Sequence, residues 1–376
     1  MIRAALLGPV EPFRSGIARH TTALARALRR RPDCDVRVYS FSRQYPTLLF
    51  PGESDRASDT RAPSDLDVTY AIDSIDPRTW WRVAEAIRTY RPDVVVAPMW
   101  TFFLAPCLTA ILARQRCAIV GIVHNVADHD ARRISSWVSS LPIRRASGFV
   151  THTQDLAASV RRIVPGARVE VHHHPIFDYP APRGTLPKRA DLELLMFGLI
   201  RPYKGLDVLL DALAACRKKA LMLSVVGESW QNDAELRESI AQKGLEDRVE
   251  LVARYVSDLE AAEYFARADV VVLPYRSVTG SGVLPLAFHY GKAVAASDLP
   301  GFRELLVNGE TGWLLPVGDP TALARVIDEQ ISRKSAIDMT PAISEARRRL
   351  SFDHFADTVL EAAMTRSDVA SPKSHC

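Results

Sequence analysis

Two cations three residues apart, Arg201 and Lys204, stand in a short segment between two apolar patterns. The apolar run at 194–197 has the length of a buried strand and meets Gly198 directly. A helical pattern begins near Leu206, so the segment is predicted to be a strand, a tight turn and a helix. In such a turn both cations can reach an anion held at the free N–H groups of the incoming helix. Taken alone, the pair is more often two solvated cations of an ordinary connection.

A second segment, YRSVTGSGVLPLAFHYG at 275–291, gives these cations a shared target. Its small residues lead into a helix that is expected to begin at Val283. The backbone N–H groups of Ser281, Gly282 and Val283 would then face an anion. A helix start on one connection and two cations on another together predict a site for a diphosphate.

Polar side chains also follow a strand of the first half. The apolar run at 118–123 is followed by His124 and Asn125, with His129 shortly after. Parallel sheets bind ligands at the carboxyl ends of their strands, so these side chains are candidates for a reaction centre. A structural role for His124 is equally compatible with its position.

Aromatic side chains follow another strand of the first half, at Trp100 and Phe102. They would form an apolar platform for a sugar ring or a lipid at the mouth of the site. Packing under the next helix is the alternative, and the pattern does not separate the two.

These side chains must be positioned by strands and helices, which alternate through the chain in two series. Strands separated by helices imply parallel sheets. The segment 172–189 contains four prolines and interrupts the alternation, so it is expected to link the two series. We predict an α/β protein of two doubly wound domains that face each other across a cleft. The predicted ranges are 1–175, 176–350 and, for a C-terminal helix with a loose tail, 351–376.

Composition restricts the class of protein. With 376 residues, 47% hydrophobic and 24% charged, the chain has the size and balance of a soluble protein of two domains. Its five cysteines are widely spaced and predict neither a disulfide framework nor a zinc site. Residues 94–113 lack charge, but Pro98 and Pro106 divide them into a strand, a loop and a helix. The apolar N-terminal run is too short for a signal peptide, which favours a cytoplasmic location.

The formal net charge of +4 is unevenly distributed, because the first half is basic and the second half is slightly acidic. Short arginine clusters recur at 29–31, 132–133, 144–145 and 161–162. They suggest contact with an anionic membrane surface, such as the inner face of the plasma membrane. The cluster at 29–31 also fits a helix C-terminus, where cations are favoured. No nucleic-acid-binding motif accompanies the charge, so nucleic acid is not expected as a partner.

The second half resembles a known enzyme family. The segments FGLIRPYKGLDVLLDAL and ADVVVLPYRSVTGSGVLPLAFHYGKAVAASDLPGFRELLVNGETGWLLPVGDP are similar to the C-terminal domain of the retaining GT-B glycosyltransferases of family 4. The first half agrees more diffusely, through the loop at 14–16, IVHNVADHD and THTQDL. The resemblance implies two Rossmann-like domains, the first binding an acceptor and the second a nucleotide sugar. It implies transfer of a sugar to a saccharide or lipid-linked acceptor, in glycan or cell-surface polysaccharide biosynthesis.

The resemblance also implies roles for individual residues. Arg201 and Lys204 would hold the nucleotide diphosphate, and His124 would stand beside the donor sugar, so these three are expected to be catalytic. Arg254 and Tyr255 correspond to a loop that borders the base. The implied donor-binding residues are Gly16, Arg201, Lys204, Arg254, Tyr255, Ser281, Gly282, Val283 and Glu304, and the acceptor-binding candidates are Trp100, Phe102, Asn125 and His129.

One departure from the family pattern concerns mechanism. Many members carry two glutamates eight positions apart in the donor site, but here SGVLPLA stands instead, with no carboxylate between Tyr275 and Gly291. A covalent glycosyl-enzyme needs a positioned Asp or Glu nucleophile. We therefore expect a front-face displacement with retention, in which the leaving diphosphate takes the acceptor's proton and neither a metal nor another cofactor is required.

Two other functions are compatible with the sequence, and two apparent metal-binding motifs are not expected to bind an ion. The missing glutamates are compatible with a non-catalytic relative that binds a nucleotide sugar or serves as a scaffold for a partner transferase. A nucleotide-sugar epimerase on the same fold is a third possibility. The D-x-D triplets at 33–35 and 65–67 are expected to be incidental, and only Asp128 and Asp130 of the third are expected to lie near the cleft. The histidines at 172–174 are a poor metal site, because neighbours on an extended chain point to opposite sides.

Overall fold

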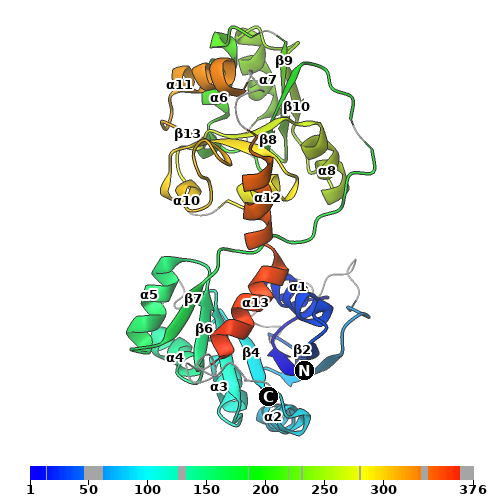
Figure 1. Cartoon of the computed structure of the whole chain (residues 1–376), viewed down its shortest axis with the longest axis vertical. Coiled ribbons are helices and arrows are strands. Elements are labelled where there is room, and N and C mark those ends of the chain that lie inside the picture. Colours follow the sequence, from blue (N-terminus) through cyan, green and yellow to red (C-terminus); the bar gives the residue numbers. More distant parts are fainter. Residues whose placement is uncertain are drawn as a thin grey trace, which may run out of the picture. The chain divides into compact units, whose positions relative to one another are not determined.

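The computed structural model describes residues 1–13, 15–45, 62–125, 133–184, 186–218, 220–229, 232–278, 281–331 and 338–364. The chain forms two compact units, one of Met1–Phe177 with Leu350–Cys376 and the other of Asp178–Arg349. Each unit has its own sheet of parallel strands with helices packed on it (Figure 1). This arrangement confirms the predicted α/β class with two Rossmann-like units.

The sheet of the first unit has, within the described residues, the order β3-β2-β1-β4-β5-β6-β7. Its central strands are continuous apolar runs, as expected for strands that helices cover on both faces. Alternate residues of β1 serve the two faces: Ala5 and Leu7 belong to one buried cluster and Ala4 and Leu6 to the other. The strands are β1 (Ile2–Leu7), β2 (Cys34–Arg43), β3 (Val68–Asp73), β4 (Val94–Met99), β5 (Ala118–Val123), β6 (Gly148–Thr151) and β7 (Arg168–Val171).

The helices of the first unit begin at residues that the sequence marks. Ser15 precedes the first helix and caps it, because its hydroxyl accepts a hydrogen bond of 3.0 Å from the N–H of Ala18. The uncharged stretch 94–113 forms a strand and a helix separated by a loop, as predicted. The helices are α1 (Gly16–Arg30), α2 (Pro77–Tyr90), α3 (Ala105–Leu112), α4 (Arg133–Ile143), α5 (Gln154–Ile163) and α13 (Phe352–Ala363). No helix among the described residues is long and apolar enough to cross a membrane.

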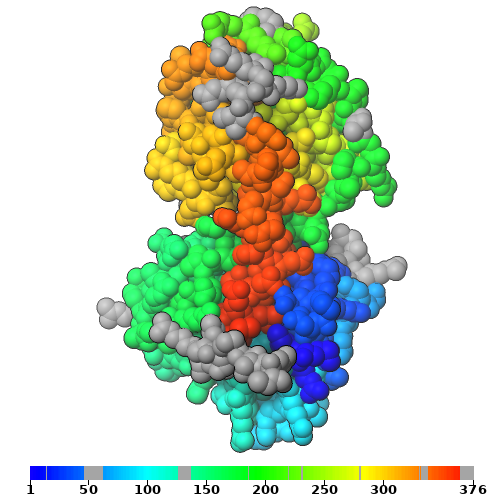
Figure 2. All heavy atoms as spheres, viewed as in Figure 1, coloured from blue at the N-terminus to red at the C-terminus, as the bar shows by residue number. Residues whose placement is uncertain are grey.

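The last helix, α13, belongs to the first unit although it follows the second unit in the sequence. Figure 2 shows it in red between α1 in blue and the green strands and helices on its other side, and α13 packs on α1, β5 and β6. Phe355 is fully buried in this contact. A Cβ at Gly148 would lie 2.0 Å from the carbonyl oxygen of Ala362, so the close approach of α13 to β6 requires glycine there.

The second unit contains, within the described residues, a parallel sheet in the order β10-β9-β8-β11-β12-β13. Chain order reverses between β8 and β11, which is the place where open parallel sheets bind ligands. The strands are β8 (Leu192–Phe197), β9 (Leu221–Val226), β10 (Val249–Val252), β11 (Val270–Leu273), β12 (Ala293–Ser297) and β13 (Gly312–Leu315). The helices are η2 (Pro202–Lys204), α6 (Leu206–Ala215), α7 (Asp233–Gln242), α8 (Asp258–Arg267), α9 (Val283–His289), α10 (Pro300–Arg303), α11 (Pro320–Val326), η3 (Ile327–Ile331) and α12 (Thr340–Arg349).

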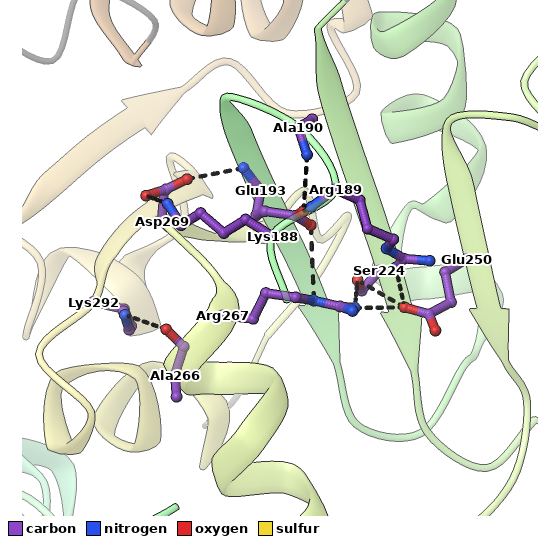
Figure 3. Close-up of polar contacts among 10 residues, drawn as sticks. All are labelled: Lys188, Arg189, Ala190, Glu193, Ser224, Glu250, Ala266, Arg267, Asp269 and Lys292. Carbon is purple, nitrogen blue, oxygen red and sulfur yellow. Dashed lines mark hydrogen bonds and ion pairs between the residues drawn. The ribbon is translucent and has the colours of Figure 1, made fainter. Parts of the chain in front are cut away.

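An ionic network stabilises the second unit away from the carboxyl ends of its strands (Figure 3). Arg267 and Glu193 are 6% and 1% exposed, and Arg267 Nε lies 3.8 Å from the Glu193 carboxylate. The same guanidinium donates to Glu250 at 2.5 Å and to Ser224 at 2.7 Å. Glu193 also accepts a hydrogen bond of 2.5 Å from the backbone N–H of Arg189. These contacts offset the cost of burying the charges and fasten the segment that precedes β8 to the sheet.

Candidate active site

The turn after β8 places Lys204 inside the second unit. Gly198 ends the strand with φ of 90°, and η2 carries the chain to Gly205, whose φ is 71°. A Cβ at Gly205 would lie 2.0 Å from the carbonyl oxygen of Pro274, after β11, so glycine is required there. The two glycines bring the turn close to β11 and direct Lys204 into the space between these two connections.

Lys204 is a buried cation. Its side chain is 6% exposed, and no carboxylate pairs with it in the part of the chain that the structure describes. Its Nζ lies 3.1 Å from the point that a Cβ on Gly198 would occupy, and 5.4 Å from the centre of the Tyr275 ring. Burial lowers the pKa of Lys204 to about 8, and the positive charge of Arg201 acts in the same direction. The site therefore has a deficit of negative charge that an anionic ligand would correct.

The connection after β11 faces this turn. Tyr275 is 2% exposed, and burial raises the pKa of its hydroxyl. The next residue, Arg276, donates to Asp207 at 2.8 Å and so is already paired. Ser281 and Gly282 precede α9 as predicted, but the N–H of Val283 donates to the Ser281 hydroxyl at 3.3 Å. Residues 279 and 280 of this connection lie outside the described residues.

A cavity of about 470 Å³ opens beside the same turn. Two arginines and one acid supply its charged lining, and Leu206 and Leu210 of α6 supply much of its apolar wall. Its lining residues are Arg201, Pro202, Tyr203, Leu206, Asp207, Leu210, Leu236, Ser239 and Arg276. Arg201 therefore lines a cavity that can hold a ligand, and its charge also acts on the buried ammonium group of Lys204.

The remaining donor-site candidates lie at the carboxyl ends of other strands in the same sheet. Arg254 follows β10 and is exposed, with its guanidinium bound to Glu260 at 2.5 and 3.0 Å. The neighbouring Tyr255 is 75% exposed. Glu304 follows α10 and is also exposed. The topology brings these three to one edge with Lys204, but β10 is two strands from β8, or about 10 Å away.

The first unit places the other candidates at the carboxyl edge of its own sheet. Gly16 is the first residue of α1, and a Cβ there would meet no atom within 4 Å. His124 and Asn125 follow β5, and the N–H of His124 donates to the carbonyl of Met99 at 3.0 Å. His129 lies outside the described residues. The structure thus leaves room for a ligand at Gly16 and fixes the backbone that carries His124.

The two aromatic candidates differ in their surroundings. Trp100 is partly buried and packs against the core of the first unit, whereas Phe102 is 43% exposed. Trp100 is thus used mainly in packing, whereas Phe102 presents an accessible apolar surface.

A cluster of histidines surrounds His124 and was not predicted from the sequence. Its ring centre lies 4.8 Å from that of His20 on α1, 5.0 Å from that of His152 and 6.1 Å from that of His174. Burial, followed by the neighbouring imidazoles, lowers the pKa of His124 well below its usual value, so the ring is neutral at pH 7. A usable signal was present, because His152 and His174 each follow a strand of the same parallel series.

Several arginines of the first half form ion pairs with acidic side chains. Arg30 and Arg31 form ion pairs with Asp353 and Asp357 of α13. They therefore act in packing, beyond the interaction with the helix dipole that the sequence suggested. Among the acids of the D-x-D triplets, Asp33 pairs with Arg31, Asp65 with Arg26 and Asp67 with Arg37. The residues at 128–130 lie outside the described part of the chain.

Comparison with known proteins agrees with this architecture. Residues 14–177 match the family described as Glycosyltransferase Family 4, and residues 191–333 match Glycosyl transferases group 1. A GDP-mannose:glycolipid 4-beta-D-mannosyltransferase of Xanthomonas campestris is 29% identical over 66% of this chain and 73% of its own length. A glycogen synthase of Mycobacterium tuberculosis is 25% identical over 73% of this chain and 68% of its own.

Solved structures show the same fold. HepE of Anabaena, determined with UDP, covers 96% of this chain and 99% of its own, with 20% identity and a TM-score of 0.61. A glycosyltransferase of Rickettsia africae covers 96% and 98%, with 15% identity and a TM-score of 0.66. The two family matches together span most of the chain and meet close to the boundary between its units. The chain belongs to the GT-B glycosyltransferases of family 4 and is a glycosyltransferase.

Proposed function

We propose that this enzyme transfers a sugar from a nucleoside diphosphate sugar to a saccharide or lipid-linked acceptor during the synthesis of a glycan or cell-surface polysaccharide. The second unit would bind the donor and the first unit the acceptor. Relatives named as mannosyltransferases acting on glycolipid and phosphatidyl-myo-inositol support this class of acceptor. HepE, which has been solved with UDP and UDP-glucose, supports a nucleotide sugar as donor.

The observation that carries the proposal is the state of Lys204. A buried ammonium group is normally paired, because taking an unpaired charge out of water is costly. Lys204 has no acidic partner among the described residues, and its pKa is lowered to about 8. A diphosphate beside Lys204 and Arg201 would supply the missing negative charge. It would also raise the pKa of Lys204 and keep the amine protonated during the reaction.

The proposed reaction retains the configuration of the sugar. The bond between the anomeric carbon and the diphosphate oxygen breaks, and the acceptor oxygen bonds to the same face of that carbon. The acceptor's proton passes to the leaving diphosphate oxygen, so no enzyme carboxylate is needed as base or nucleophile. Lys204 and Arg201 stabilise the charge that grows on the leaving group, which is why no metal is required.

Inversion of configuration is the second candidate, and a specific observation favours it. The Xanthomonas relatives are named for forming a β-mannosyl linkage from GDP-mannose. An inverting displacement needs a base on the face opposite the leaving group. His124 is neutral at pH 7, and its Nε2 has no hydrogen-bond partner among the described residues, so a ring nitrogen is available as base. Burial lowers the pKa of this imidazole, which makes it a weak base. The anomeric configuration of the product, compared by NMR with that of the donor, separates the two mechanisms.

Peripheral contact with the cytoplasmic face of a membrane is the proposed location. Trp137 on α4 is 63% exposed, and Arg144 and Arg145 after that helix are exposed as well. An aromatic side chain next to cations suits the headgroup region of an anionic bilayer. Co-sedimentation with phosphatidylglycerol vesicles should fall when both arginines are replaced by glutamine. Equal sedimentation of the two proteins would argue against this location.

The function is tested first with a panel of UDP-, GDP- and ADP-sugars. Thermal shift measures binding, and nucleotide release measures hydrolysis or transfer, with and without EDTA. Binding with slow, EDTA-resistant release supports a metal-independent transferase and identifies its donor. Binding without release, even with saccharide and polyprenyl-linked acceptors added, would favour the non-catalytic alternative. Release that EDTA abolishes would overturn metal independence.

A further inference from the structure

The histidine cluster of the first unit contains more imidazoles than the transfer reaction uses. His20, His152 and His174 each offer a ring nitrogen, and these nitrogens all lie within 4.8 Å of one another. His20 is 1% exposed and His152 is 6% exposed, while His174 is exposed at the rim. The three residues come from α1 and from the chain after β6 and β7, so the fold brings together side chains that are far apart in the sequence.

The two buried rings have unsatisfied nitrogens. Within the described residues, three of their ring nitrogens have no hydrogen-bond partner: Nδ1 and Nε2 of His20, and Nε2 of His152. Leaving a buried polar atom unpaired is costly, because the atom loses its hydrogen bonds to water. Native proteins keep few such atoms, so a group of them indicates a bound ion or water.

The backbone holds His152 in the orientation of a metal ligand. Its Nδ1 lies 2.9 Å from the carbonyl oxygen of His172. A carbonyl can only accept, so the proton of the neutral ring is on Nδ1 and the lone pair is on Nε2. Metal-bound histidines are fixed in this way by a backbone carbonyl.

We propose that His20, His152 and His174 form a binding site for a transition-metal dication of the Zn²⁺ class. Three imidazole nitrogens without a carboxylate suit Zn²⁺, Co²⁺, Ni²⁺ or Cu²⁺ and do not suit Mg²⁺ or Ca²⁺. In a tetrahedral site with Zn–N bonds of about 2.0–2.1 Å, ligand nitrogens lie about 3.4 Å apart. The separations of up to 4.8 Å must therefore contract by up to about 1.4 Å. His174 can move because it is exposed, while the buried His20 and His152 provide a fixed pair.

The surroundings favour retention of a bound ion. Phe352 and Phe355 of α13 lie against His20, with ring centres 5.2 and 5.1 Å away. Phe355 also contacts the ring of His152 at 5.7 Å. An apolar wall of this kind limits solvent access to a bound metal and lowers the local dielectric constant.

Occupation of the site would inhibit transfer, a consequence that rests on the function proposed above. The His124 ring lies 4.8 Å from His20 and 5.0 Å from His152, so the ion would be next to the expected reaction centre. The reacting sugar develops positive charge in the transition state. A dication nearby would raise the energy of that state, or would take His124 as its fourth ligand.

The test uses the full chain, prepared without a polyhistidine tag and treated with a chelator. Zn²⁺ is titrated by calorimetry, and Co²⁺ by the intense visible absorption of a tetrahedral site. We expect one ion per chain, bound in the micromolar range or tighter, and a rise in Tm of several degrees at excess metal. His174→Ala should weaken binding at least tenfold, and because His174 is exposed this variant should fold. The matched control is the adjacent His173→Ala, which should bind like the unmodified protein.

Three results would overturn the proposal: no saturable binding at 100 μM metal, binding unchanged in His174→Ala, or equal losses in His174→Ala and His173→Ala. His152→Gln provides a second variant, with the same expected loss. Metal binding is read by spectroscopy and heat, without an activity assay. A failure to detect transfer would therefore refute the proposed function alone, and absent metal binding in an active enzyme would refute the metal site alone.

Discussion

Replacing Lys204 by methionine should have opposite effects on the free protein and on donor binding. Burial and the charge of Arg201 lower the pKa of Lys204 from 10.5 to about 8. That difference corresponds to about 3 kcal/mol against the charged form at neutral pH, and screening by solvent reduces it to about 2 kcal/mol. Lys204→Met removes this cost in a side chain of similar volume. The unliganded second unit should therefore become more stable, with a Tm about 4–8 °C higher.

Donor binding should weaken in the same variant. Hydrogen bonds between a cation and an anion contribute about 1.5–3 kcal/mol, so the Kd for the donor should rise about ten- to 150-fold. The turnover number should fall by a larger factor than the affinity, because negative charge on the diphosphate grows as the sugar leaves. Calorimetry, thermal unfolding and initial rates measure the three effects.

The matched control is Lys243→Met, since Lys243 pairs with Asp211 on the surface of the same unit. It should change Tm by little and leave the Kd for the donor unaltered. A lower Tm for Lys204→Met together with an unchanged Kd would show that Lys204 serves packing alone. Equal losses in affinity and turnover would assign it to ground-state binding without a role in the chemical step.

Three further predictions concern the pH dependence of donor binding, the glycine at 205 and the packing of Phe355. Donor affinity should fall about tenfold per pH unit above pH 8, where Lys204 loses its proton in the free enzyme, and titrations of Lys204→Arg should show a flat profile to pH 10. Gly205→Ala should destabilise the second unit by several kcal/mol and abolish donor binding, because its Cβ would lie 2.0 Å from the Pro274 carbonyl. At Gly244, which has φ of 62° and open surroundings, alanine should cost only about 1 kcal/mol in urea denaturation. Phe355→Ala should cost about 3–5 kcal/mol in the same assay by leaving a cavity between α13 and the first sheet. A loss below 1 kcal/mol for Phe355→Ala would mean that α13 is only loosely attached.

Much of the fold could be predicted because its strands are buried on both faces. Runs such as the one that forms β4 contain nothing but apolar residues and leave little choice of structure. The strands β3 and β13 were not predicted. The former has a single buried residue, Ile72, and the latter is four residues long with two of them only partly buried. Such strands owe their structure to the neighbour they pair with, which a local pattern does not contain.

The site was predictable where its residues are adjacent in sequence and unpredictable where they are not. Arg201 and Lys204 share one turn, and the glycines that flank Lys204 mark it as tight. The imidazoles around His124 come from separate elements, and nothing local to His20 indicates that His152 lies beside it. Likewise, the arginines at 29–31 have the composition of a solvated cluster, and only the return of α13 to the first unit supplies the partners of Arg30 and Arg31.

The position of α13 has a consequence for the order in which the protein is made. The core of the first unit needs Phe355 and its neighbours, which a ribosome adds only after all of residues 178–349. The unit that begins first is therefore completed last, and the second unit can fold while the first still lacks a helix. Until α13 arrives, the apolar face beside α1 is open to solvent and to other chains, as in other partly folded intermediates. Slow synthesis of the last residues, or truncation before α13, would prolong that exposure. A chaperone that binds the apolar face would be needed most at that stage.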